Sequence, residues 1–243
     1  LHLSIRRQRQ MCIRDSFNTM LEALRGSVAR QRQLVQDASH ELRTPLTSLR
    51  ANTELLERGT LSDADRTSIL ADMRAEVDEL ADLSAELSAL AIDNRTTEEP
   101  ESIDLSDIAH EVATRASRRS GAPVTVHATP GTTVIARPNQ LERALSNLVD
   151  NAIKFTNDSS EIEIHIGSFR VEVRDKGIGI TDADKPLVFD RFYRATATRS
   201  MPGSGLGLSI VSQFALDHNA SAYVLDNAGG GAIVGLQFPI PAA

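Results

Sequence analysis

Cysteine is almost absent from this chain of 243 residues, in which Cys12 stands alone. A single thiol excludes an internal disulfide and a cysteine-rich metal cluster, and it fits a reducing compartment. The six histidines are scattered and show no spacing typical of metal ligands. No apolar run approaches the ~20 residues of a membrane-spanning helix, so we expect none of the printed residues to cross a bilayer.

The sequence also lacks an excess of positive charge. Its 26 Lys and Arg residues stand against 33 Asp and Glu, which gives a net charge of -7. A nucleic-acid partner is therefore not expected, because binding a phosphate backbone needs a dense basic surface. Apolar residues make up 41% of the chain, enough for a buried core, and the length predicts two domains. Because Leu1 is not an initiating Met, we expect a portion of a longer protein.

The first domain is predicted to be helical. Residues 1–16 match no motif, and we expect a solvated end there. Within residues 17–93, apolar side chains recur at steps of three and four from 17 to about 58 and from 64 to about 92, which predicts two amphipathic helices. A glycine stop and a new helix cap separate them. Such an antiparallel hairpin covers only part of its own apolar surface, so we expect a homodimeric four-helix bundle.

A second domain is predicted after a polar, proline-containing linker at 94–102. Within 103–243, helical and strand-like patterns are mixed, and a hairpin turn is expected at Gly167-Ser168. This mixture predicts an α/β sandwich with a largely antiparallel or mixed sheet. The expected helices are 105–118, 139–155 and about 205–217, and the expected strands are 124–127, 133–136, 162–166, 171–173, 222–225 and 233–238.

His40 is the first candidate for chemistry. Helical geometry turns Ala38 and Leu42 toward the core and His40 toward solvent. A lone exposed histidine on a helix usually has no function. Here Glu41 is its neighbour and Thr44 follows one turn later, so a carboxylate can orient one ring nitrogen and leave the other as a nucleophile.

Asn147 and Asn151 lie one turn apart on a predicted helix, with Lys154 three residues further on. Buried asparagines are normally caps or interhelical hydrogen-bonding groups. Two at this spacing can instead offer amide oxygens to Mg²⁺ carried by a nucleotide, because Mg²⁺ prefers oxygen ligands and shares them with phosphates. Both interpretations stay open at this point.

Two glycine patterns follow. Asp175, Gly177 and Gly179 come directly after a predicted strand, and they indicate either a simple turn or a carboxylate that accepts from an exocyclic amine beside flexible backbone. A second run places Gly203, Gly205, Leu206 and Gly207 at the start of a helix, where backbone amides suit phosphate. Alone this run is a weak signal, since it lacks the lysine and preceding strand of a Walker loop.

The stretch 188–202 between these patterns contains Phe189, Phe192 and Tyr193, and its second half is polar. We interpret it as a hinged lid. Its Arg194 either reaches a terminal phosphate or is an ordinary solvated surface arginine.

In their order along the chain, the segment around His40, the Asn147/Asn151 pair, the Asp175 turn, the phenylalanine-containing stretch and the final glycine run resemble sensor histidine kinases of two-component systems. The resemblance covers residues 17–238. It implies a dimerisation and histidine-phosphotransfer hairpin followed by a Bergerat-type ATP-binding domain. Residues before 17 do not resemble the rest of a HAMP signalling module, which can precede such a hairpin in this family.

Residues 17–24 resemble the end of a HAMP signalling linker. That likeness implies a cytoplasmic portion of a sensor whose full-length form is anchored in the membrane by an upstream segment. The hairpin from Glu161 to Asp175 is shorter than is typical of the family.

The resemblance also implies roles for single residues. His40 would be the phosphoacceptor, Glu41 its acid/base partner, and Thr44 a helper in dephosphorylating the partner. Asn151 would hold Mg²⁺ near Asn147. The second domain would bind ATP. Asp175 would recognise the adenine, and Lys154 and Arg194 would approach the phosphates. The other nucleotide-binding residues would be Gly177, Gly179, Gly203, Gly205, Leu206 and Gly207.

The function implied is ATP-dependent autophosphorylation of His40 and transfer to an aspartate of a response regulator, with regulator phosphatase activity. Two alternatives are an ATPase of the same fold that drives conformational change and a non-catalytic dimerisation scaffold. The His40 segment on a dimerising hairpin disfavours the ATPase.

Overall fold

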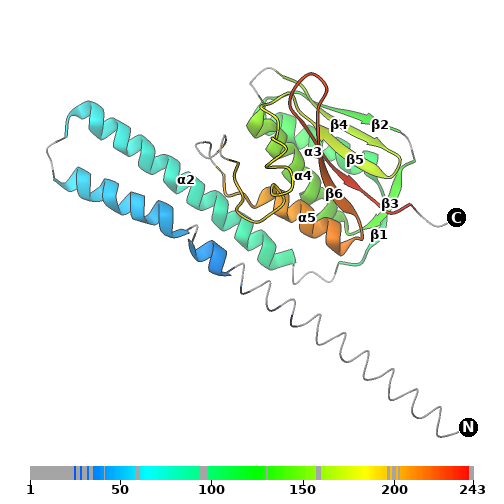
Figure 1. Cartoon of the computed structure of the whole chain (residues 1–243), viewed down its shortest axis with the longest axis horizontal. Coiled ribbons are helices and arrows are strands. Elements are labelled where there is room, and N and C mark those ends of the chain that lie inside the picture. The colour runs from blue at the N-terminus through cyan, green and yellow to red at the C-terminus, as the bar shows by residue number, and fades with distance from the viewer. Residues whose placement is uncertain are drawn as a thin grey trace, which may run out of the picture. The chain divides into compact units, whose positions relative to one another are not determined.

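The computed structural model divides into two compact units, Leu1–Leu80 and Ala81–Ala243 (Figure 1). The division falls within a helix, and the domain boundaries predicted above stay predictions. The predicted HAMP end and Glu41 lie outside the described residues. The structure describes residues 25, 28, 32, 35–40, 42–58, 61–93, 98–129, 131–156, 160–195, 198, 201 and 203–240.

The first unit contains the predicted helical hairpin. Residues 42–57 form one helix, and α2 (Asp63–Asp93) begins after the turn. Ser62 caps α2, since its Oγ accepts a hydrogen bond from the Asp65 backbone at 3.2 Å and donates to the Asp65 carboxylate at 2.7 Å. The predicted helix start is confirmed. None of the described helices is both long and apolar enough for a bilayer crossing.

A single copy of the hairpin leaves large apolar side chains exposed on both helices. Ala38 is buried, whereas Val35, three residues earlier, is 61% exposed. Exposed apolar surface on two joined helices indicates that another surface covers it in the working protein. The exposed residues are Val35, Leu46, Leu55, Leu70 and Val77.

The second unit is built on a five-stranded mixed sheet of order β2-β4-β5-β7-β6. The β2–β4 pair is parallel and the other pairs are antiparallel, which confirms the predicted sheet class. The strands are β2 (Val124–Ala128), β4 (Ile162–Gly167), β5 (Arg170–Arg174), β6 (Ser221–Asp226) and β7 (Ala232–Gln237).

Three helices cover one face of this sheet: α3 (Leu105–Ser120), α4 (Pro138–Phe155) and α5 (Gly207–Asp217). Burial along β4 alternates, because its isoleucines face the helices while the residues between them face away. The sandwich fold is therefore confirmed. Its fully buried core includes Leu141, Leu145, Leu148, Ile162, Ile164 and Val211.

The chain also forms a small two-stranded antiparallel ribbon, of which β3 was predicted and β1 was not. Strand β1 (Glu101–Asp104) pairs with β3 (Thr133–Ala136), so the last two residues of the expected linker are extended and hydrogen-bonded. Asp104 then caps α3 by accepting from the Ser106 N–H at 2.8 Å.

The turn between β4 and β5 lies one residue later than predicted. Gly167 pairs with Arg170, and the two loop residues are Ser168 and Phe169, whose φ angles are 53° and 58°. A two-residue hairpin of this type needs positive φ at both central positions, and here no glycine supplies it. Gly167 instead admits Thr129, whose Oγ1 would lie 3.2 Å from any Cβ added there.

Candidate functional site

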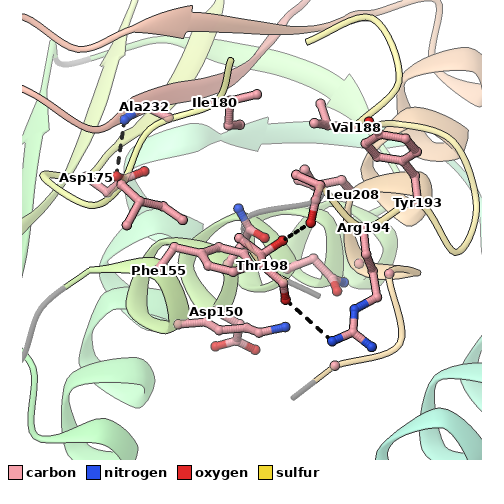
Figure 2. Close-up of a pocket in the computed structure, with 18 of the residues that line it drawn as sticks. Asp150, Phe155, Asp175, Ile180, Val188, Tyr193, Arg194, Thr198, Leu208 and Ala232 are labelled. Carbon is pink, nitrogen blue, oxygen red and sulfur yellow. Dashed lines mark hydrogen bonds between the residues drawn. The ribbon is translucent and has the colours of Figure 1, made fainter. Parts of the chain in front are cut away.

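A cavity of about 690 Å³ opens in the second unit among α4, the segment after β5 and the segment before α5 (Figure 2). This volume suits a nucleotide-sized ligand. The fold brings most of the predicted nucleotide residues to its wall, whereas Gly177 and Leu206 lie outside the lining. The predicted residues that line it are Asn147, Asn151, Lys154, Asp175, Gly179, Arg194, Gly203, Gly205 and Gly207.

Asp175 follows directly after β5 and is only 5% exposed. Its Oδ1 accepts hydrogen bonds from the backbone of Gly177 at 2.8 Å and of Ala232 at 3.1 Å (Figure 2). Both bonds fall on one oxygen, which leaves Oδ2 for a donor on a ligand. The pKa of Asp175 is raised above its ordinary value, because the effect of burial exceeds the opposing effect of these two hydrogen bonds.

Glycines shape the backbone around Asp175. A side chain on Gly177 would collide with the Phe155 carbonyl at the end of α4, and one on Gly231 would collide with the Asp175 carbonyl. Asn227 donates from Nδ2 to that carbonyl at 2.7 Å. Gly177 therefore packs against the end of α4 and donates its backbone N–H to the Asp175 carboxylate.

Three residues at this end of the site were not predicted from the sequence: Asn227 and Gly231 in the β6–β7 connection, and Ala232 at the start of β7. The available signal was the run of three glycines before β7, since a glycine cluster between two strands often marks close backbone approach.

The two asparagines differ in their hydrogen bonding. Asn147 donates from Nδ2 to the Arg143 carbonyl at 2.9 Å, and a Cβ on Gly207 would stand 3.0 Å from Asn147 Oδ1. The amide of Asn151 has no hydrogen bond among the described residues, although it lines the cavity. Asn151 therefore offers an oxygen to a ligand, while Asn147 packs against the start of α5.

The glycine run meets Lys154 at its first member. Gly203 has φ 135°, and a Cβ there would collide with the Lys154 ammonium group. That ammonium also lies 4.9 Å from the centre of the Phe155 ring. The glycine thus lets a cation stand beside the backbone that precedes α5.

The rest of the run forms the turn into α5. Ser204 Oγ accepts from the Leu206 N–H at 3.1 Å, and the fully buried Leu206 anchors the turn. Gly205 has φ 74°, and its carbonyl accepts from the Phe192 N–H at 3.0 Å. The turn is therefore joined directly to the predicted lid.

Arg194 lies on the side of the cavity away from Asp175 (Figure 2). Its guanidinium donates to the carbonyls of Thr198 and Met201, and the side chain is half-buried. Arg194 is therefore a partly buried side chain that is hydrogen-bonded to its own segment, and its role at a phosphate stays a prediction. Tyr193 fixes the start of this segment by donating to Asp184 at 2.6 Å.

Arg119 and Asp150 form an ion pair on the cavity wall that sequence reasoning also missed. Burial raises the pKa of Asp150, and the charge and hydrogen bond of Arg119 lower it. Asp150 adjoins Asn151 in the sequence, but nothing in the sequence paired it with an arginine on another helix.

The hairpin displays His40 as predicted. His40 and Thr44 are both exposed, while Ala38, two residues earlier, is 8% exposed and faces inward. An imidazole and a hydroxyl one helical turn apart are therefore open to a reactant.

Two family models match separate parts of the chain. Residues 30–92 match the His Kinase A (phospho-acceptor) domain, and residues 136–242 match the histidine kinase-, DNA gyrase B-, and HSP90-like ATPase. His40 and Thr44 fall in the first match, and the cavity wall from Asn147 to Ala232 falls in the second. The chain combines a phosphoacceptor-type domain with an ATPase-type domain, which supports the use of ATP.

Mycobacterial proteins provide similar sequences over nearly the whole chain. It is 38% identical over 235 residues to the signal transduction histidine-protein kinase/phosphatase MprB of Mycobacterium sp. (strain KMS), covering 92% of this chain and 46% of the relative. It is 39% identical over 227 residues to MprB of Mycobacterium leprae (strain TN), covering 89% and 44%. The chain thus spans under half the length of these relatives.

Solved structures agree. The mycobacterial sensor histidine kinase MprB is 34% identical, with a TM-score of 0.51, over 56% of this chain and 95% of that chain. Full-length ShkA in complex with AMPPNP shares the fold at 23% identity and a TM-score of 0.55, over 82% of this chain and 43% of that chain. The chain belongs to the sensor histidine kinase family.

Proposed function

We propose that this protein uses ATP to phosphorylate His40 and passes the phosphoryl group to an aspartate of a response regulator, whose dephosphorylation it also assists. The observation that carries the proposal is the combination in one chain of an exposed histidine on a helical hairpin and a nucleotide-sized cavity. That cavity ends at a buried carboxylate with one uncommitted oxygen.

The adenine end of the cavity is assigned to Asp175. Its fixed Oδ2 accepts from the exocyclic amine, and Gly179, with φ 71°, lets the backbone lie close to a planar base. Apolar side chains complete this end: Ile178, Ile180 and Leu208 also line the cavity.

The phosphate end is assigned to the opposite wall. The N-terminus of α5, opened by the glycine run, and the Lys154 ammonium supply positive potential. Arg194 exchanges its bonds to the Thr198 and Met201 carbonyls for bonds to phosphate oxygens when the lid closes over the nucleotide.

Mg²⁺ fits the donors present at this end. Asn151 presents an amide oxygen without a protein hydrogen bond among the described residues, and oxygen is the ligand that Mg²⁺ prefers. The ion, when bound with ATP, offsets negative charge on the phosphates. Asn151 would hold it, while Asn147 Oδ1 lies against Gly207 at the start of α5.

The chemistry at the hairpin is a transfer in two steps. An imidazole nitrogen of His40 attacks the γ-phosphorus, the bond to the β,γ-bridging oxygen breaks, and ADP leaves with that electron pair. Glu41 takes up or orients the ring proton. A regulator carboxylate then attacks the phosphohistidine, and Thr44 positions the water that later hydrolyses the acyl phosphate.

The exposed apolar surface of the hairpin also indicates how the protein assembles. The apolar side chains exposed on both hairpin helices are covered by a second copy, which gives a homodimeric four-helix bundle. The response regulator docks beside His40. The full-length protein places this portion in the cytoplasm, below an upstream membrane anchor.

Incubation of the purified chain with γ-labelled ATP and Mg²⁺ tests the proposal. We expect label on the protein that is labile in acid and stable in alkali, and its transfer to a response regulator encoded beside the gene. Released phosphate without protein label would indicate an ATPase instead. The absence of both protein label and released phosphate would indicate a scaffold. Either of these two outcomes would overturn the proposal.

A further inference from the structure

The outer face of the sheet carries a cluster of metal-ligating groups that no part of the proposed kinase chemistry uses. His127 on β2 stands directly opposite His165 on β4, and Glu163 lies two residues before His165 on the same face. One potential ligand atom from each of the three lies within 4.8 Å of the others. Strand pairing thus brings together two of the six histidines that are scattered along the sequence.

These side chains are directed away from the core. Along β4 the isoleucines are buried in the helix-covered face, while Glu163 and His165 alternate with them and are half-buried. His127 is exposed. A dissolved ion therefore reaches the cluster without any opening of the fold, on the face of the sheet that the helices do not cover.

We propose that His127, His165 and Glu163 bind a divalent transition-metal ion of the zinc type. Two imidazoles and one carboxylate are a ligand set that such an ion accepts, with water in the remaining position. The ion would tie β2, the edge strand, to its neighbour β4.

The present distances fit an ion after small side-chain movements. His165 Nε2 and Glu163 Oε2 are hydrogen-bonded at 2.6 Å, whereas two ligands on a tetrahedral zinc ion stand about 3.3 Å apart. A bound ion would take the place of this hydrogen bond, and the two atoms would separate slightly. The His127 and His165 rings already lie side by side with centroids 4.7 Å apart.

The arginine that stands opposite Glu163 on this face is committed to another carboxylate, and Lys176 contributes a positive charge near Glu163. Arg174 stands opposite Glu163 in the β4–β5 ladder, but its guanidinium donates to Glu172 at 2.7 and 3.2 Å. Glu172 also accepts from Tyr223 at 2.9 Å. Arg174, Glu172 and Tyr223 are therefore already bonded to one another, and the proposed metal ligands are His127, His165 and Glu163.

Titration of the full chain with Zn²⁺ against a chromophoric zinc chelator, in millimolar Mg²⁺, tests this proposal. We expect one tight site per chain. His127→Ala and His165→Ala should each lose at least about 10-fold in zinc affinity, the lower end of what even an outer partner of a metal ligand costs. His110→Ala, which removes another exposed histidine of the same domain, is the matched control and should keep wild-type affinity.

Thermal unfolding supplies a second readout on the same proteins. Zn²⁺ should raise the Tm of the wild type and of His110→Ala, and it should not raise the Tm of His127→Ala, because only binding to the folded state stabilises it. Equal zinc affinity in all variants, or no stoichiometric binding by the wild type, would overturn the proposal. A variant that fails to fold is replaced by Glu163→Gln, for which the same loss is expected.

Discussion

The backbone N–H of Ala232 on β7 donates to Oδ1 of Asp175, which follows β5, at 3.1 Å. The Asp175 N–H in turn donates to the Ala232 carbonyl at 3.0 Å. A buried carboxylate on the cavity wall is thus held by the neighbouring strand as well as by its own turn. Its position is fixed before any nucleotide arrives, which reduces the ordering that binding requires.

We expect Asp175→Asn to weaken ATP binding. The asparagine has one accepting oxygen and one donating NH₂ group. If its oxygen keeps the bonds from the Gly177 and Ala232 N–H groups, its NH₂ group faces the adenine amine, and two donors then meet. The loss should be on the order of 1 to 3 kcal/mol, about 5- to 150-fold in Kd. Calorimetric titration with ATP measures it, and the exposed Asp217→Asn is the control. Unchanged affinity would remove Asp175 from the adenine site.

Gly203→Ala should also weaken ATP binding, by at least about 5-fold, because the methyl group displaces the Lys154 ammonium. Gly229→Ala is a matched control, since Gly229 also has positive φ, 101°, but a Cβ there meets nothing within 4 Å. The control should lower Tm without changing the Kd for ATP. A Kd raised equally in both variants would show that backbone strain, rather than the Lys154 contact, is responsible, and a wild-type Kd in both would contradict the role of that contact.

The stability of the nucleotide-free protein should depend on pH through Asp175. Burial raises the pKa of this carboxyl from its ordinary 3.8, so the folded state binds the proton more tightly than the unfolded state. Its contribution to stability is fully present below the unfolded pKa and is lost as pH rises through the folded pKa. The Tm of the wild type minus that of Asp175→Asn should therefore fall as the pH rises above about 4, the ordinary pKa of an aspartate. A difference that rises with pH instead would mean that the two backbone hydrogen bonds outweigh burial.

Thr44→Ala should separate two activities of the hairpin. The exposed hydroxyl lies one turn after His40 and is not needed for attack on ATP, but hydrolysis of an acyl phosphate needs a positioned water. We expect much of the autophosphorylation rate to remain and most of the regulator dephosphorylation rate to be lost. Both rates are measured on one preparation. A parallel fall would indicate a disturbed helix near Pro45, and an unaffected phosphatase rate would remove Thr44 from the mechanism.

Local patterns predicted the regular elements well. The alternation of Ile162, Ile164 and Ile166 predicted β4, and three- and four-residue steps predicted the helices, because each pattern reflects one buried face. Strand β1 was missed because its sequence, ESID, contains a single apolar residue and its pairing with β3 is long-range. The hairpin turn was misplaced because Ser168 and Phe169 adopt positive φ without glycine.

The candidate site was predictable only where its residues are close in sequence. Asn147, Asn151 and Lys154 share one helix, so spacing alone placed them together. The contacts of Asp175 with Ala232 and Asn227, and the pairing of His127 with His165, depend on which strands become neighbours. Strand order is set by the packing of the whole domain, and no single segment contains it.

The central claim is that His40 receives the phosphoryl group of ATP. The most direct test compares the wild type, His40→Gln and His110→Gln after incubation with γ-labelled ATP, with ATP affinity measured on each. Nucleophile and cavity belong to separate units, so all three should bind ATP alike. Acid-labile label should appear on the wild type and on His110→Gln and be absent from His40→Gln. Acid-labile label on His40→Gln would contradict the account.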